Sequence, residues 1–130
     1  MLLIIGTVTS ANKENVETYN KIIEVCKQFS NNISSPLDTM QFKGSNEEKY
    51  KWAMERVGQA ELIIAEMSVP SLGQGMELQE AVRLKIPTII VAKEGSKVSG
   101  VILGTKIIKK VIYYHDIDEL QVKLKEALDG

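Results

Sequence analysis

Short apolar runs alternate with amphipathic segments along the whole chain. Continuous apolar runs predict strands at residues 2–5, 62–65, 87–92 and 110–114, and a shorter stretch predicts another strand at 32–34. Apolar residues that recur at helical spacing predict helices at 12–29, 45–57, 73–85 and 116–128. Between residues 34 and 45, a segment with one proline and one glycine is predicted to be a loop.

Strands that alternate with helices in this way are typical of a parallel sheet. The sequence therefore predicts an α/β fold over residues 1–130: a single-domain, Rossmann-like (flavodoxin-like) five-stranded parallel sheet with helices on both faces. The first run, residues 2–5, is apolar throughout, which indicates a strand that is buried on both of its faces.

Composition narrows the possible partners. The chain has 130 residues, of which 44% are hydrophobic and 25% charged, and its net charge is −1. This mixed charge argues against dominant attraction to a nucleic acid polymer or to an anionic membrane. No stretch approaches the roughly 20 apolar residues of a membrane span, and the first residues lack the pattern of a signal peptide, so we expect a cytoplasmic protein.

Cys26 is the only cysteine, which excludes an internal disulfide and a zinc site built on cysteines. Its neighbours at helical spacing, Ile22 and Phe29, place it on an apolar stripe. A buried structural thiol is therefore favoured over a nucleophile. We expect neither a metal nor a cofactor.

Ligands of open parallel sheets bind beyond the carboxyl ends of the strands. Three segments fall at that edge: residues 6–10, 35–40 and 66–75. The first offers backbone amides and hydroxyls suited to a phosphate or a ribose, although many turns between a strand and a helix look similar. It matches neither the GxGxxG fingerprint nor a P-loop.

The segment from Ser71 to Glu77 joins a strand to a helix through Gly73 and Gly75. Ser71 and Gln74 have the spacing of a capping box, so the start of the helix should be well defined. Glycines there let a ligand approach the backbone closely, and the exposed amides of a helix N-terminus favour an anion.

Glu77 occupies an unusual position. Ala81 and Leu84 share its helical stripe, which places the carboxylate on the side of the helix that faces the sheet. Burial of a carboxylate there costs several kcal/mol unless it is hydrogen-bonded or lies in a wet cleft. Two interpretations remain open: a functional carboxylate in a cleft, or a structural one that caps the loop backbone.

Residues 59–82 resemble the nucleoside 2-deoxyribosyltransferase superfamily, and most closely its branch of 2′-deoxynucleoside 5′-monophosphate N-hydrolases. The resemblance is most specific at Pro-Ser-Leu-Gly-x-Gly-x-Glu, residues 70–77. It implies that Glu77 is the catalytic carboxylate, which attacks or stabilises the anomeric carbon through an oxocarbenium-like transition state. A looser match extends over the rest of the chain, as far as residues 97–100.

The same resemblance assigns further residues. It implies that Ser71, Gly73 and the Gly6-Thr7-Val8 loop hold the 5′-phosphate and the sugar of a nucleoside monophosphate. It also implies that Ser99 reaches into the site of a neighbouring subunit, and therefore that the protein is a homodimer.

Two positions depart from the family pattern. Leu3 stands where the family usually carries a tyrosine, and Ala53 stands where it usually carries a catalytic aspartate. Asp38 and Glu66, at the same edge of the sheet, are candidate substitutes. Asp38 is equally a residue type that caps turns, which is the favoured interpretation of it.

Three functions remain open after the sequence is considered. The first is an N-glycosidic hydrolase of nucleoside monophosphates. The second is a nucleoside deoxyribosyltransferase, although that branch usually has Asp-x-Gly before its glutamate, where this chain has Ser71-Leu72-Gly73. The third is a non-catalytic nucleotide-binding or sensing module, which Leu3 and Ala53 motivate.

Overall fold

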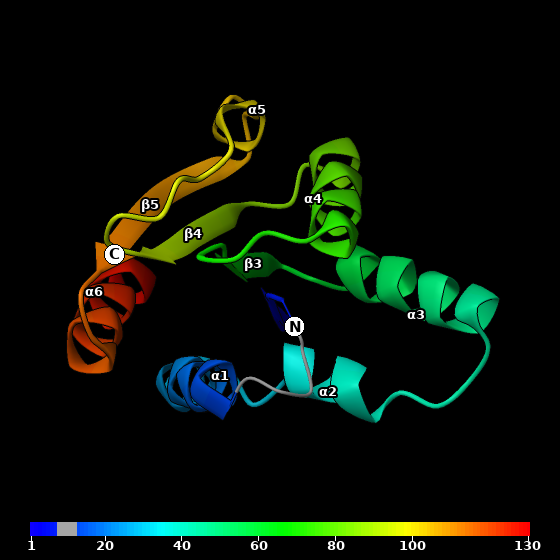
Figure 1. Cartoon of the computed structure of the whole chain (residues 1–130), viewed down its shortest axis with the longest axis horizontal. Helices are drawn as coiled ribbons and strands as arrows, with labels where there is room; N and C mark the ends of the chain where they lie inside the picture. Colours follow the sequence, from blue (N-terminus) through cyan, green and yellow to red (C-terminus); the bar gives the residue numbers. More distant parts are fainter. Residues whose placement is uncertain (8–12) are drawn as a thin grey trace.

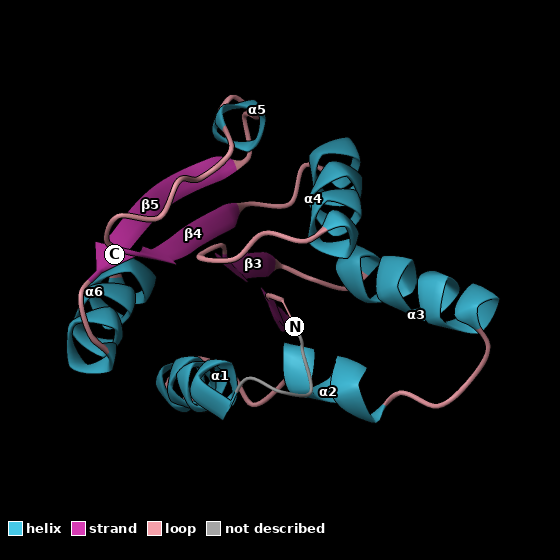
Figure 2. Ribbon diagram, viewed as in Figure 1, coloured by secondary structure: helices cyan, strands magenta, loops and turns pink. Residues whose placement is uncertain are grey.

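A computed structural model describes residues 1–7 and 13–130 and contains one five-stranded sheet. All of its paired strands are parallel, in the order β2-β1-β3-β4-β5. Strands β3, β4 and β5 follow one another in this order in Figure 2. The strands are β1 Leu2–Ile5, β2 Ile33–Ser34, β3 Leu62–Glu66, β4 Thr88–Lys93 and β5 Ile108–Tyr114. The predicted α/β fold with a five-stranded parallel sheet is therefore confirmed.

Helices cover both faces of the sheet, as the sequence predicted. Helices α1 and α6 lie against one face, and α3 and α4 lie against the other, while α5 lies near β5 (Figure 1). The helices are α1 Lys13–Cys26, α2 Pro36–Gln41, α3 Asn46–Gly58, α4 Leu72–Leu84, α5 Gly100–Leu103 and α6 Ile117–Asp129. In the described part of the chain, no helix is both long enough and apolar enough to cross a membrane.

Strand β1 shows why the apolar runs form strands. Leu2 and Ile4 join the core under α1 and α6, whereas Leu3 and Ile5 join the core under α3 and α4. Alternate side chains of a strand point to opposite faces, so a continuous apolar run suits a strand that is covered on both sides. Cys26 is fully buried in the first of these cores, and burial raises the pKa of its thiol to about 12, in keeping with a structural role.

The sequence pattern did not predict α2 or α5. Helix α2 has six residues and α5 has four, so neither completes the repeat of apolar positions on which the prediction relied. Local start signals for α2 are nevertheless present, because Ser35 is its N-cap and Pro36 is its first residue. The loop predicted between residues 34 and 45 is therefore partly helical.

The strand order creates a crevice at one edge of the sheet. From β1 the chain leads into α1 on one face, and from the neighbouring strand β3 it leads into α4 on the other face. In doubly wound sheets, ligands bind at such a switch point, beyond the carboxyl ends of the strands. The fold thus brings the Gly6 turn and the N-terminus of α4 to the same place.

Candidate functional site

A cavity of about 550 Å³ lies at this switch point. Its walls come from the end of β1, from α2 and α3, and from the first turns of α4. A volume of this size is ordinary for a small-molecule site. Five of the residues predicted from the sequence line the cavity together: Gly6, Thr7, Ser71, Gly73 and Glu77.

The Gly6–Thr7 turn is tied to its surroundings from two sides. The Tyr19 hydroxyl of α1 donates a hydrogen bond of 2.6 Å to the carbonyl oxygen of Thr7, and the Thr7 hydroxyl donates to the carbonyl oxygen of Val69. A Cβ atom on Gly6 would lie 2.3 Å from the Tyr19 hydroxyl oxygen, so only glycine fits there. Val8, which was predicted to belong to the same binding loop, lies outside the described residues.

The N-terminus of α4 forms one end of the cavity. Ser71 is the N-cap, and its hydroxyl accepts a hydrogen bond from the Gln74 amide, as the sequence predicted. Gly75 supplies the first amide that bonds within the helix, to the carbonyl oxygen of Ser71. The amides of Leu72 and Gly73 precede this bond and have no acceptor within the helix, so they are suited to an anion.

The predicted capping box of Ser71 and Gln74 is only half formed. The Gln74 side chain does not return to the cap; its Nε2 donates a hydrogen bond of 2.7 Å to the carbonyl oxygen of Glu66, at the end of β3. Gln74 is almost fully buried, and its Oε1 has no hydrogen-bond partner among the described atoms. The side chain therefore joins α4 to β3 in the wall of the cavity.

Glu77 lies one turn further along α4. Its side chain is only 15% exposed, and its Oε2 lies 3.4 Å from Nη2 of Arg56. Burial raises the pKa of the Glu77 carboxyl above its ordinary value, and the charge and hydrogen bond of Arg56 partly oppose that shift. The carboxylate is therefore largely desolvated and lies in a cavity wall rather than in bulk solvent, which was one of the two arrangements that the sequence pattern left open.

Arg56 was not singled out by the sequence analysis. It lies in the last turn of α3 with only 7% of its side chain exposed, and its guanidinium carbon sits 4.3 Å from the centre of the Trp52 ring. Trp52 and Arg56 are four residues apart, so they share one helix face. An arginine and a tryptophan at this spacing, with the arginine three residues after Ala53, were the available signal.

Asp38 does not line the cavity. Its Oδ2 accepts hydrogen bonds from the Ser35 amide at 3.0 Å and from the Ser34 hydroxyl at 3.1 Å, as the third residue of a capping box at the start of α2. These bonds hold the carboxylate at the helix N-terminus. The structure therefore gives Asp38 the capping geometry that the sequence favoured, and does not bring it to the cavity as a catalytic carboxylate.

Leu3 and Ala53, the two residues that differ from the pattern implied by the sequence resemblance, have different surroundings. Ala53 lines the cavity, whereas Leu3 is fully buried in the core under α3 and α4. Glu66, the second candidate substitute, is buried and accepts hydrogen bonds from Ser68 and from the Tyr114 hydroxyl, and it is not part of the cavity wall. Glu77 is therefore the only carboxylate among the described residues that line the cavity.

Two predicted binding residues are not in the wall either. Gly75 follows Gly73 on α4 but does not line the cavity. Ser99 is exposed at the N-terminus of α5 and is also absent from the wall. Among residues 1–7 and 13–130, no three His, Cys, Asp or Glu side chains are grouped so that they could hold a metal ion.

Comparison with known proteins rests on structure alone. The sequence matches no protein-family model and no curated protein. The fold is similar to that of the CMP N-glycosidase of Clostridium botulinum, with a TM-score of 0.68 and 18% identity over 95% of this chain and 96% of the other. It is equally similar to the 2-deoxyribosyltransferase of the psychrotolerant bacterium Bacillus psychrosaccharolyticus, with a TM-score of 0.68 and 16% identity over 93% of this chain and 90% of the other.

These two similarities show that the chain shares its fold with an N-glycosidase and with a deoxyribosyltransferase, in agreement with the fold that the sequence resemblance implies. A signal receiver domain from Vibrio parahaemolyticus shares the architecture with a TM-score of 0.51 and 17% identity, over 98% of this chain and 88% of the other. Because one architecture serves such different proteins, function has to be argued from the site.

Proposed function

We propose that this chain hydrolyses the N-glycosidic bond of a ribo- or deoxyribonucleoside 5′-monophosphate, with Glu77 as the catalytic carboxylate. One observation carries the proposal: the Glu77 carboxylate lines the same cavity as the N-terminus of α4 and the Gly6–Thr7 turn. A carboxylate and an anion site in one cavity suit a substrate that carries both a phosphate and a glycosidic carbon. The fold similarity to a CMP N-glycosidase supports the same function.

The cavity suggests how the substrate is seated. We expect the 5′-phosphate at the N-terminus of α4 beside the Gly6–Thr7 turn, with the Ser71 hydroxyl and the Leu72 and Gly73 amides as donors. The sugar then spans toward Glu77, and the base extends toward the aromatic side chains of α3 and the residue after α2. These are Phe42, Tyr50 and Trp52, which line the cavity on that side.

The chemistry follows from this placement. As the bond from C1′ to the base nitrogen breaks, its electron pair leaves with the base, and positive charge develops on C1′ and the ring oxygen. The ionised Glu77 carboxylate stabilises this charge or forms a bond to C1′. The oxygen of a water molecule then bonds to C1′ and frees Glu77, and a proton from that water ends on the base nitrogen that left with the electron pair. The products are the free base and a sugar 5-phosphate.

Base release from a panel of nucleotides tests the proposal. The wild-type chain is incubated with ribo- and deoxyribonucleoside 5′-monophosphates, and free base is quantified by chromatography. We expect release from at least one nucleotide and its loss in Glu77→Gln. The matched control is Glu80→Gln, one turn along α4, where the carboxylate pairs with Arg83 instead of facing the cavity. Equal release by wild type and Glu77→Gln would contradict the proposal.

A non-catalytic nucleotide-binding module is the second candidate. The observation that favours it is Ala53, which lines the cavity at the position of a family carboxylate, with no other described carboxylate beside Glu77 to replace it. If the chain is such a module, the wild-type protein should bind monophosphates in calorimetry but release no base from any of them. A deoxyribosyltransferase would instead transfer the sugar of an unphosphorylated nucleoside when a second base is added.

A further inference from the structure

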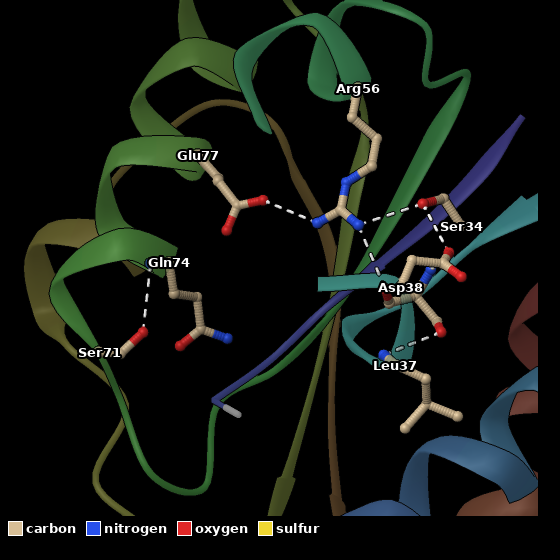
Figure 3. A network of polar contacts seen from close by, with 8 residues as sticks. Ser34, Leu37, Asp38, Arg56, Ser71, Gln74 and Glu77 are labelled. Atoms are coloured by element: carbon tan, nitrogen blue, oxygen red, sulfur yellow. Dashed lines mark hydrogen bonds and ion pairs between the residues drawn. The ribbon is translucent and has the colours of Figure 1, made fainter. Parts of the chain in front are cut away.

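Arg56 is held by groups from three different segments (Figure 3). Its Nη1 donates hydrogen bonds of 3.2 Å to the Ser34 hydroxyl at the end of β2 and of 3.2 Å to the Ser35 carbonyl oxygen. Its Nη2 faces Glu77, and its guanidinium plane lies near the Trp52 ring. The guanidinium is thus fixed on one side, which leaves its other terminal nitrogen directed at the carboxylate.

The anchoring groups are themselves fixed. The Ser34 hydroxyl that accepts from Arg56 donates to Asp38, whose carboxylate caps α2. The ring of Trp52 stacks on Phe42 with 5.0 Å between ring centres. A chain of contacts therefore runs from Asp38 through Ser34 and Arg56 to Glu77, and connects the start of α2 with α4.

We propose that Arg56 is a positioning residue for Glu77, which it orients toward the sugar and keeps ionised within a desolvated cavity wall. This inference rests on the proposed function of Glu77. An arginine suits the task because its planar fork can bond to two sets of acceptors at once, whereas a lysine offers a single point charge. Asp38 contributes to the site through this chain of contacts and not by touching the substrate.

Among the described charged groups near Glu77, Arg56 is the one that contacts its carboxylate. The other titratable side chains that line the cavity, Lys49 and Tyr50, come from the first half of α3, and Asp38 faces Arg56 from α2. On α4 itself, Glu80 is engaged by Arg83. Of these groups, Arg56 is the cation in direct contact with the Glu77 carboxylate.

Removal of Arg56 should raise the pKa of Glu77, because burial and Arg56 shift this pKa in opposite directions. Burial raises the pKa of the carboxyl, and Arg56 lowers it. Removal of the cation leaves burial unopposed, so the pKa rises further and the carboxylate becomes protonated at a higher pH. The acid limb of the pH–activity profile, which reports ionisation of Glu77, is then displaced to higher pH.

The test is an NMR titration of the ¹³C-labelled Glu77 carboxyl, which needs no turnover. Arg56→Gln should move the titration midpoint to higher pH, and Arg56→Lys should restore part of the shift. The control is Arg83→Gln, which removes an exposed arginine of α4 and should leave the midpoint unchanged. An unchanged midpoint in Arg56→Gln would overturn the inference, whether or not the protein is an enzyme.

Turnover provides the second readout. If base release is found, Arg56→Gln should lower kcat by about 10²-fold, the loss typical of a misplaced reacting group, with a smaller effect on KM. Should Arg56→Gln fail to fold, Ser34→Ala removes one anchor of Arg56 and should shift the acid limb in the same direction by a smaller amount. Loss of kcat with an unmoved acid limb in the folded variants would show a merely structural role and overturn the inference.

Discussion

At the scale of single residues, two glycines of the cavity obey different constraints. Gly6 lies against Tyr19 so closely that a Cβ atom would overlap with the phenol ring. Gly73, in the first turn of α4, has no atom within 4 Å of the place where a Cβ would stand. The fold therefore requires the first glycine and does not require the second, which suggests that a ligand uses the open space at Gly73.

Alanine substitutions at Gly6 and Gly73 should have different effects, one on the stability of the fold and the other on nucleotide binding. Gly6→Ala should lower the melting temperature, because Tyr19 must move and lose its bond to Thr7. Gly73→Ala should leave stability unchanged or raise it by up to about 1 kcal/mol, since alanine favours a helix, while it weakens nucleotide binding. Thermal melts and calorimetry check both. Unchanged nucleotide affinity in Gly73→Ala would remove Gly73 from the binding site.

The perturbed carboxyl of Glu77 predicts how stability depends on pH. Because burial raises its pKa in the folded state, the folded chain binds a proton more tightly than the unfolded chain does, and this contribution to stability falls as pH rises through the window above the ordinary glutamate pKa. Glu77→Gln should therefore be as stable as wild type or more stable at pH 7, and gain nothing at pH 4. Denaturant titrations at both pH values measure this.

Glu80→Gln is the matched control for that experiment. The hydrogen bond between Glu80 and Arg83 lowers the pKa of Glu80, so the loss of this partly exposed carboxylate should slightly destabilise the fold at pH 7, which is the opposite of the effect expected for Glu77→Gln. A marked loss of stability in Glu77→Gln at pH 7 but not at pH 4 would instead show that the ionised Glu77 carboxylate has a structural role.

At the scale of secondary structure, the features that could be predicted from the sequence are those that depend on residues close together along the chain. The apolar run of β1 and the Ser71 cap of α4 depend on neighbours within a few positions, and both were predictable. The role of Arg56 depends on β2, α2 and α4, which are distant in sequence, and no local pattern brings them together. Helix α2 fell between these cases, because its cap was visible but its length was too short for a periodic pattern.

Helix α3 offers a direct test of the missing carboxylate. Ala53 lines the cavity and cannot accept a hydrogen bond from the sugar or hold a proton near the leaving base. Positioned acid–base groups typically contribute 10²–10⁴-fold, so Ala53→Asp should raise base release by about 10-fold or more if this group limits the wild type. Chromatography of free base measures the change. No change would show that residue 53 does not limit turnover.

At the scale of the whole molecule, the fold is shared with proteins of 16–18% identity, while two large apolar side chains are almost fully exposed. Leu72 of α4 is 91% exposed and Val101 of α5 is 84% exposed. Pairing of two chains about a two-fold axis is one way in which such side chains are covered. This is in keeping with the proposed homodimer, in which Ser99 reaches the partner's cavity.

Light scattering at micromolar concentration should therefore give the mass of two chains. Val101→Lys should shift the mass toward one chain, because a charge would be buried without a partner at the interface. Val122→Lys, the same substitution at an exposed valine of α6, is the control and should remain dimeric. A wild-type chain that is monomeric in this experiment would contradict both the dimer and the role of Ser99.

The proposed function requires that a nucleotide lies in this cavity with its anomeric carbon against residue 77. The most direct measurement is a crystal structure of Glu77→Gln soaked with the nucleoside 5′-monophosphate that the wild type binds most tightly. We expect the phosphate at the Leu72 and Gly73 amides, C1′ in contact with the substituted side chain at position 77, and the base toward Trp52. A phosphate bound elsewhere, or a base rather than C1′ against residue 77, would contradict it.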